Sequence, residues 1–198
     1  MKARPILFSG EMVRALLAGH KTQTRRIIKP RGGEEVDPEG IYDLRPGDIE
    51  IARCPYGQAG DLLWVREAIE LIDYRPELEQ SMYSADCTPT VADAWPWKRR
   101  SLPAMHCPRG LSRLTLGITD VRVERLNDIS RGDAMEEGCP FPNMAKGPNP
   151  VDWYAELWRE INGEASWDAN PWVWVIEFVV HHANVDHILN AAREAGAA

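Results

Sequence analysis

Residues 111–126, LSRLTLGITDVRVERL, constrain the fold more than any other part of the sequence. Apolar residues alternate with polar or small ones along most of this stretch, at Leu114, Leu116, Ile118, Val121 and Val123. A period of two places successive side chains on opposite faces of a strand, so the stretch predicts a long, half-buried β-strand. A strand needs hydrogen-bonding neighbours, and the chain must therefore be built around a sheet.

The rest of the chain contributes dispersed strands and helices. Ser9 is a suitable N-cap for a first helix, and Gly19 stands where a left-handed residue would end it. Residues 61–72 fit either a strand or a helix, and the Gly60-Asp61 turn favours a strand. Because strands outnumber helices and do not alternate strictly with them, an α+β fold around a small barrel is favoured over a doubly wound sheet. Further strands are expected over 4–9, 22–28, 81–85 and 171–180, and helices over 10–18, 129–138, 151–161 and 185–196.

Aromatic residues indicate part of the core. In the helix expected over 151–161, Trp153, Leu157 and Ile161 fall on one face, and Trp158 lies at the next step round it. Helical or strand spacing accounts for four tryptophans as core residues: Trp153, Trp158, Trp172 and Trp174.

Chain length bounds the domain organisation. A chain of 198 residues is expected to form one compact domain with one large insertion. We expect the domain over 1–182, its loop-rich insertion over about 30–110, and a tail or short helix over 183–198. Proline, glycine and aspartate predict a loop at 30–48.

Positive charge is concentrated in two segments of a chain whose formal net charge is −7. Residues 1–33 contain eight Lys/Arg and one acidic residue, Glu11, and residues 94–119 contain five Lys/Arg and no acidic residue. Two basic segments in an acidic chain fit a local anion site better than a broad duplex-binding face.

Cysteine usage and the N-terminus point to a cytoplasmic protein. Four scattered cysteines without a C-x-x-C pair argue against a zinc ribbon and a disulfide framework. The apolar run at the N-terminus is interrupted by Ser9, Gly10, Glu11 and Arg14, unlike a signal peptide. No stretch approaches the roughly 20 apolar residues of a membrane span. We therefore expect no membrane partner, no metal and no cofactor; the sequence does not define an oligomeric state.

The segment GHKTQTRR, residues 19–26, is either a solvated basic turn or the floor of a site for an anionic or nucleotide-like ligand. A lysine becomes a base near neutral pH only if desolvation or nearby cations lower its pKa, and a threonine hydroxyl needs a base to become a nucleophile. In a regular strand Lys21 and Thr24 would point to opposite faces. Their convergence requires Lys21 to lie in a turn, or a bulge before Thr24.

The spacing Gly19-x-Lys21-x-x-Thr24-x-Arg26 resembles the G-x-K-x-x-[T/E]-x-R signature of the ASCH (activating signal cointegrator homology) domain family. GDLLWVRE, DAMEEG and PWVWVIEF follow in the same order as in bacterial and phage-borne members, so the resemblance covers about residues 5–180. It implies a PUA-like fold, a small mixed β-barrel with flanking helices and a cleft lined by the signature.

The resemblance also implies an activity. Small bacterial members are amidohydrolases that convert N(4)-acetylcytidine to cytidine and acetate. By this similarity Lys21 is the proton acceptor, Thr24 the nucleophile and Glu137 the proton donor, with Glu136 as the neighbour that could replace it. Arg26, or backbone N–H groups near Gly19, would stabilise the oxyanion.

Other classes of function stay open, because this chain is nearly twice as long as those enzymes. One alternative is an RNA-binding PUA-like module that grips single-stranded RNA without catalysis, and another is a weak ribonuclease. Trp97, next to Lys98-Arg99-Arg100, could stack a base or anchor a loop. Glu67 could face the cleft beside Lys21, or form a strand-end ion pair with Arg66. Glu177, within an apolar strand, is either an outward residue or a buried partner for an arginine.

Overall fold

The computed structural model describes residues 1–29, 54–71, 81–90, 95, 97–141 and 147–196 of the chain. These residues form a mixed α+β structure with two sheets, which confirms the fold class expected from the sequence. Closure of a sheet into a barrel stays a prediction. The loop expected over 30–48 lies outside the described residues.

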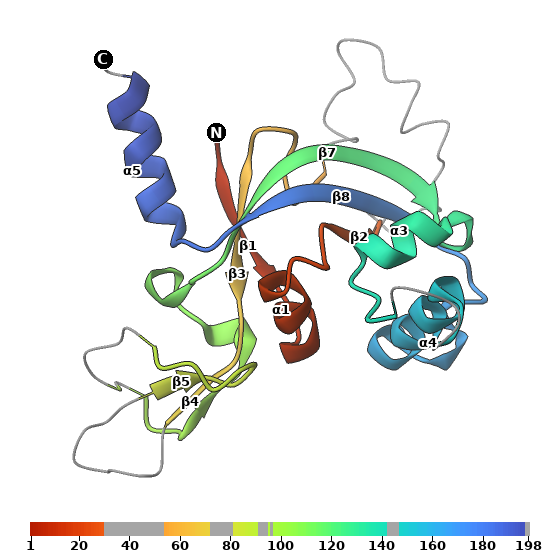
Figure 1. The fold of residues 1–198 in the computed structure, drawn as a ribbon, viewed down its shortest axis with the longest axis horizontal. Helices are drawn as coiled ribbons and strands as arrows, with labels where there is room; N and C mark the ends of the chain where they lie inside the picture. The colour runs from red at the N-terminus through yellow and green to blue at the C-terminus, as the bar shows by residue number, and fades with distance from the viewer. Residues whose placement is uncertain (30–53, 72–80, 91–94, 96, 142–146, 197–198) are drawn as a thin grey trace. The chain divides into compact units, whose positions relative to one another are not determined.

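The larger sheet has five strands in the order β1-β3-β7-β8-β2. β1 (Ala3–Leu7) and β3 (Leu62–Arg66) are parallel, while β3 pairs antiparallel with β7 (Thr115–Arg125). β2 (Gln23–Ile27) pairs antiparallel with β8 (Trp172–His181). The long strands β7 and β8 run side by side in Figure 1. The alternating segment thus forms the expected long strand.

The chain forms two compact units, each built from several segments. Unit 1 comprises Met1–Gly19, Gly60–Gly117 and Val179–Ala198, and unit 2 comprises His20–Ala59 and Ile118–Phe178. β7 and β8 each pass from one unit into the other.

Unit 2 contains β2 and two neighbouring helices, α3 (Arg131–Glu136) and α4 (Pro150–Asn162), which are labelled in Figure 1. Ser130 and Asp133 form a capping box at the start of α3. Asn149 caps α4, and Pro150 occupies its first turn, where a missing N–H is harmless. The core of this unit packs α4 against the sheet through Leu126, Ile129, Ala134, Tyr154, Trp158, Val173 and Val175.

The buried stripe of α4 differs from the expected one. Tyr154 and Trp158 are buried, whereas Ile161 is 52% exposed, so the prediction that Ile161 shares the core face is wrong. The buried face of α4 is rotated by one position from the expected face. The large ring of Tyr154 packs in the core beside Trp158, whereas the expected face counted only apolar residues. Among the four tryptophans expected in the core, Trp158 and Trp174 are buried, but Trp153 and Trp172 are only half-buried.

Unit 1 contains α1 (Gly10–Leu17) and a second, three-stranded sheet. Ser9 caps α1 as expected, since its side chain accepts from the Met12 N–H. The second sheet has the order β5-β4-β6, formed by β5 (Ser81–Tyr83), β4 (Ile69–Leu71) and β6 (Ser101–Leu102). It lies within the segment expected to be an insertion and has a core of its own, formed by Ile69, Tyr83, Trp95, Leu102 and Cys107.

The described chain ends in α5 (Val185–Gly196), where the sequence predicts a tail or short helix. Short 3-10 turns occur at Ala104–His106, Arg109–Leu111, Leu126–Asp128 and Glu164–Ser166. In the part of the chain that the structure describes, no helix is both long and apolar enough to cross a membrane.

Candidate active site

Gly19 makes the turn that precedes the candidate site. Its φ is 71°, in the left-handed region, and its N–H donates to the Leu16 carbonyl at 3.0 Å. A left-handed residue directly after a helix favours glycine. The first glycine of the signature is therefore explained by backbone geometry.

Lys21 and Glu137 form a buried ion pair in unit 2. The Lys21 Nζ lies 2.6 Å from Glu137 Oε2 and 2.8 Å from the Glu137 carbonyl oxygen. Lys21 is 0% exposed and Glu137 is 4% exposed, and the two residues also form an isolated antiparallel bridge. The Thr22 N–H donates to the Glu136 carbonyl at 2.8 Å, which fastens the same two segments together. Of the two neighbouring glutamates, Glu137 is therefore the one that meets Lys21.

The environment of Lys21 lowers its pKa. Burial lowers the pKa of Lys21, Glu137 opposes this effect, and Arg26 and Arg25 add to it. A lysine with a lowered pKa beside a carboxylate is a feature typical of functional sites, because a buried ion pair stabilises a fold no better than apolar residues of the same volume.

Arg25 is the second buried cation next to Glu137. Its Nη1 donates to Gln23 Oε1 at 2.5 Å and to Glu137 Oε1 at 3.3 Å, and its Nη2 lies 3.0 Å from Glu124 Oε2. Asp133 Oδ2 is 3.6 Å from the same Nη2. The guanidinium is thus held by groups from β2, β7 and α3.

An acidic network extends outward from Arg25. Gln23 Nε2 donates to Asp133 Oδ1 at 3.0 Å and to Glu136 Oε2 at 3.2 Å. Arg122 pairs with Glu124, Asp133 and Glu177. Glu177 is therefore a partner for an arginine, although it is half-buried and not buried as that role supposed.

Thr24 lies in β2, between Gln23 and Arg25. Strand alternation directs its side chain to the face opposite the one that carries Gln23 and Arg25. Its hydroxyl is buried and makes no hydrogen bond within the described residues. The structure thus brings Lys21 and Glu137 together, and it joins Thr24 to neither of them by a hydrogen bond.

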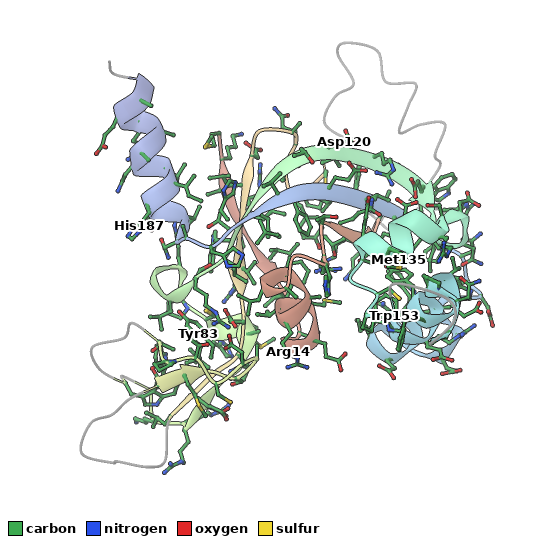
Figure 2. The ribbon with its side chains drawn as sticks, viewed as in Figure 1. Arg14, Tyr83, Asp120, Met135, Trp153 and His187 are labelled. Carbon is green, nitrogen blue, oxygen red and sulfur yellow. The ribbon has the colours of Figure 1, made fainter. Side chains whose placement is uncertain are left out.

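The other candidates of unit 2 surround this pair. Arg26 is half-buried, and its Nη1 donates to the Arg25 carbonyl at 3.1 Å. Tyr154, on α4, is buried, and the centre of its ring lies 5.9 Å from Cζ of the Arg25 guanidinium. Burial raises the pKa of Tyr154 well above its ordinary value, and the Glu137 carboxylate raises it further, so the phenol stays protonated. Figure 2 labels Met135 of α3, the helix that Glu137 caps at its C-terminus, and Trp153 of α4, the helix that carries Tyr154.

Arg66, Glu67 and Trp97, which the sequence offers as possible substrate-binding residues, belong to unit 1. The Glu67 carboxylate accepts two hydrogen bonds from Arg113, each 2.8 Å long, and the neighbouring Arg66 guanidinium donates to the Met105 carbonyl. Arg113 also pairs with Asp86 and lies 4.0 Å from the centre of the Tyr83 ring. Glu67 therefore has an arginine partner 46 positions away, which its sequence neighbourhood did not indicate.

Trp97 packs as a loop anchor. Its ring lies 4.8 Å from that of the buried Trp95 in an edge-to-face arrangement, and it packs against the core of the second sheet. Trp95 Nε1 donates to the Arg99 carbonyl at 2.8 Å. Lys98, Arg99 and Arg100 themselves are exposed.

The sequence indicated Arg25 only as a cation near Lys21 that could lower its pKa, which the structure bears out. It did not indicate the carboxylate partners of Arg25, and it missed Gln23, Glu124, Asp133 and Tyr154. The Arg25 partners Glu124 and Glu137 stand 99 and 112 positions away. Among the described residues, no group of three or more His, Cys, Asp or Glu is placed to hold a metal ion.

Comparisons with known proteins give likenesses in structure only. The sequence matches no protein-family model and no curated protein. An ASCH domain from Lactobacillus crispatus aligns with 90% of this chain and 79% of its own, at 14% identity and a TM-score of 0.45. A DUF984 protein from Enterococcus faecalis aligns with 93% of this chain and 83% of its own, at 11% identity and a TM-score of 0.41. The function proposed below rests on the signature and the site, and not on these neighbours.

Proposed function

We propose that Lys21 and Glu137 are the proton-transferring pair of a hydrolase that cleaves the amide of an N(4)-acylated cytidine-type nucleoside, giving cytidine and a carboxylate. The observation that carries the proposal is the fully buried Lys21 ammonium, 2.6 Å from the Glu137 carboxylate. The substrate class comes from the resemblance of the signature to that of ASCH amidohydrolases.

The pair supplies a base and an acid through one proton movement. Transfer of a proton from Lys21 Nζ to Glu137 Oε2 converts two buried charges into a neutral amine and a neutral carboxylic acid. Burial lowers the pKa of Lys21, and the 2.6 Å separation of the two groups is a hydrogen-bonding distance. Both groups that amide hydrolysis requires are then present together.

The reaction follows in two stages. In the first, the Thr24 Oγ1 attacks the acyl carbon and passes its proton to Lys21, the bond from that carbon to the exocyclic nitrogen breaks, and Glu137 gives its proton to that nitrogen. Cytidine leaves, and the acyl group stays on Thr24 as an ester. In the second stage the proton again passes from Lys21 to Glu137, and Lys21 then takes a proton from the water that attacks the ester carbon. The bond from that carbon to Thr24 Oγ1 breaks, Glu137 gives its proton to Oγ1, and the released carboxylic acid loses its proton to solvent.

The direct test is release of cytidine from N(4)-acetylcytidine by the purified chain, followed by chromatography. We expect turnover by the parent chain, and a loss of about 10²–10⁴-fold in kcat for Lys21→Ala. Lys29→Ala is the matched control, because Lys29 follows the same strand and is exposed. Equal activity of the parent and Lys21→Ala chains, or none in the parent, would reject the proposal.

The role of Thr24 is tested separately, because its side chain lies on the opposite face of β2 from Arg25. If Thr24 is the nucleophile, Thr24→Ser retains turnover, Thr24→Val abolishes it, and rapid quenching traps an acyl group on residue 24. Full turnover by Thr24→Val would reassign the attack to a water activated by Lys21.

The second candidate function is binding of single-stranded RNA, favoured by the exposed cations Lys98, Arg99 and Arg100. Affinity that falls steeply with salt, without cytidine release, would support this function over the hydrolase. Shortening of the RNA in the presence of chelator would instead indicate a ribonuclease.

A further inference from the structure

Glu137 has a different cation on each carboxylate oxygen. Lys21 Nζ lies 2.6 Å from Oε2, and Arg25 Nη1 lies 3.3 Å from Oε1. The side chains of both cations are 0% exposed. A carboxylate that is bound on both oxygens by two buried donors cannot rotate without breaking a charge-assisted hydrogen bond.

Arg25 is itself fixed from several sides. Gln23 Oε1 accepts from the same Nη1 that contacts Glu137, and Glu124 accepts from Nη2. Asp133 lies 3.6 Å from Nη2 and also closes the capping box of α3. Asp133 stands in the first turn of α3 and Glu137 is the C-cap of that helix, so Arg25 ties β2 to both ends of α3.

We propose that Arg25 is a positioning residue that holds Oε1 of Glu137 and so leaves Oε2 as the one oxygen that exchanges a proton with Lys21. This inference rests on the function proposed above, and Arg25 is outside the signature that suggested that function. A guanidinium suits this role because it stays protonated at every working pH and donates through a rigid fork.

The charged and titratable groups that face the Glu137 carboxylate come from three parts of the chain. β2 contributes Arg25 and Arg26, α4 contributes the Tyr154 phenol, and the segment before β2 contributes Lys21. Arg25 neutralises part of the Glu137 charge and also repels the Lys21 ammonium. Removal of Arg25 therefore strengthens the attraction between Lys21 and Glu137 and should raise the pKa of Lys21.

The matched control is Arg122. It belongs to the same acidic network and pairs with Glu124, Asp133 and Glu177. No hydrogen bond or ion pair joins it to Glu137 among the described residues. Arg122→Gln thus removes one cation from the network while the hold on Glu137 is kept.

The test is an NMR titration of Lys21 in chains labelled with ¹³C at the lysine ε-carbon, with the Lys21 signal assigned by its absence from Lys21→Ala. For Arg25→Gln we expect the Lys21 midpoint to rise by about one pH unit or more, and for Arg122→Gln to stay near that of the parent. An unchanged midpoint in Arg25→Gln, or an equal rise in both variants, would overturn the inference.

Kinetics with N(4)-acetylcytidine show whether Arg25 acts through the position it gives to Glu137 or only through its positive charge. Arg25→Lys keeps a cation but loses the fork, so we expect the Lys21 midpoint of the parent together with a kcat about 10²-fold lower. If Arg25→Gln does not fold, Arg25→Lys decides the matter, since a parental kcat would overturn a positioning role. If the parent releases no cytidine and Arg25→Gln still raises the midpoint, the proposed function fails while the hold of Arg25 on the pair stands.

Discussion

At the scale of the residue, the unusual feature is the number of charged and polar side chains buried around one carboxylate. Lys21, Gln23 and Arg25 are at most 2% exposed, and all three belong to the segment that continues from the turn at Gly19. Desolvation of such groups is offset only by good partners, and each of the three has them. The same arrangement places the Lys21 ammonium within 2.6 Å of the Glu137 carboxylate.

A stability prediction follows for Lys21. Lys21→Met leaves the Glu137 carboxylate buried with Arg25 as its remaining cation, so we expect the free energy of unfolding to fall by about 3–5 kcal/mol. The double change Lys21→Met with Glu137→Gln also removes the carboxylate that has lost Lys21, and it should restore part of that loss. Urea unfolding of the parent, the two single variants and the double variant measures both effects. Strictly additive losses would show that the two residues are not coupled.

At the scale of the element, α3 depends on its capping box. Burial acts to raise the pKa of Asp133, but hydrogen bonds from Ser130 and Gln23, together with the Arg25 charge, outweigh it and lower that pKa. A carboxyl with a lowered pKa in the folded state stabilises the fold above its unfolded pKa, about 3.9. This stability is lost as the pH falls through the lower, folded pKa.

Asp133→Asn should therefore flatten the dependence of stability on pH below about pH 4. Ser130→Ala removes the N-cap acceptor and should lower stability by about 0.5–2 kcal/mol at neutral pH. Thermal melts between acid and neutral pH measure both changes. A parental slope in acid for Asp133→Asn would contradict the role given to this carboxyl.

The start of α5 offers a prediction for unit 1. Asn184 Nδ2 donates to the Arg109 carbonyl at 2.8 Å and to the Ser112 carbonyl at 2.7 Å, while its Oδ1 accepts from the Asp186 N–H. Asn184→Ala leaves these groups without that partner and should destabilise the fold by about 1–3 kcal/mol. Asn190→Ala, at an exposed position of α5, is the control. Equal unfolding midpoints for the two variants would contradict this prediction.

Elements were more predictable than the side chains that fill the core. Alternation identified β7, and the cap at Ser9 identified α1, because both signals are local. The buried face of α4 differs from the one expected from the sequence. The pattern of purely apolar residues points to Ile161, but the ring of the amphipathic Tyr154 is buried in its place. Periodicity selects an element well, but tertiary contacts decide which neighbouring stripe is buried.

At the scale of the whole molecule, the candidate site could be predicted only in part. The signature indicated Lys21, and the resemblance indicated Glu137, which the structure places beside it. The contacts of Arg25 with Glu137 and Glu124 could not be predicted, because these carboxylates stand 112 and 99 positions away in the sequence. Both units are assembled from segments far apart in the sequence, so ion pairs such as Arg113 with Glu67 leave no local trace.

The central claim is that Lys21 and Glu137 act as one proton-transferring unit. The most direct measurement is kcat/KM for N(4)-acetylcytidine in Lys21→Ala, Glu137→Gln and the double variant, each checked for folding. When two catalytic groups act as a unit, replacing either one removes most of the rate enhancement, and replacing both removes little more. The account predicts that each single variant loses about 10²–10⁴-fold and that the double variant loses no more. Single losses that multiply in the double variant, or a Glu137→Gln chain as active as the parent, would contradict it.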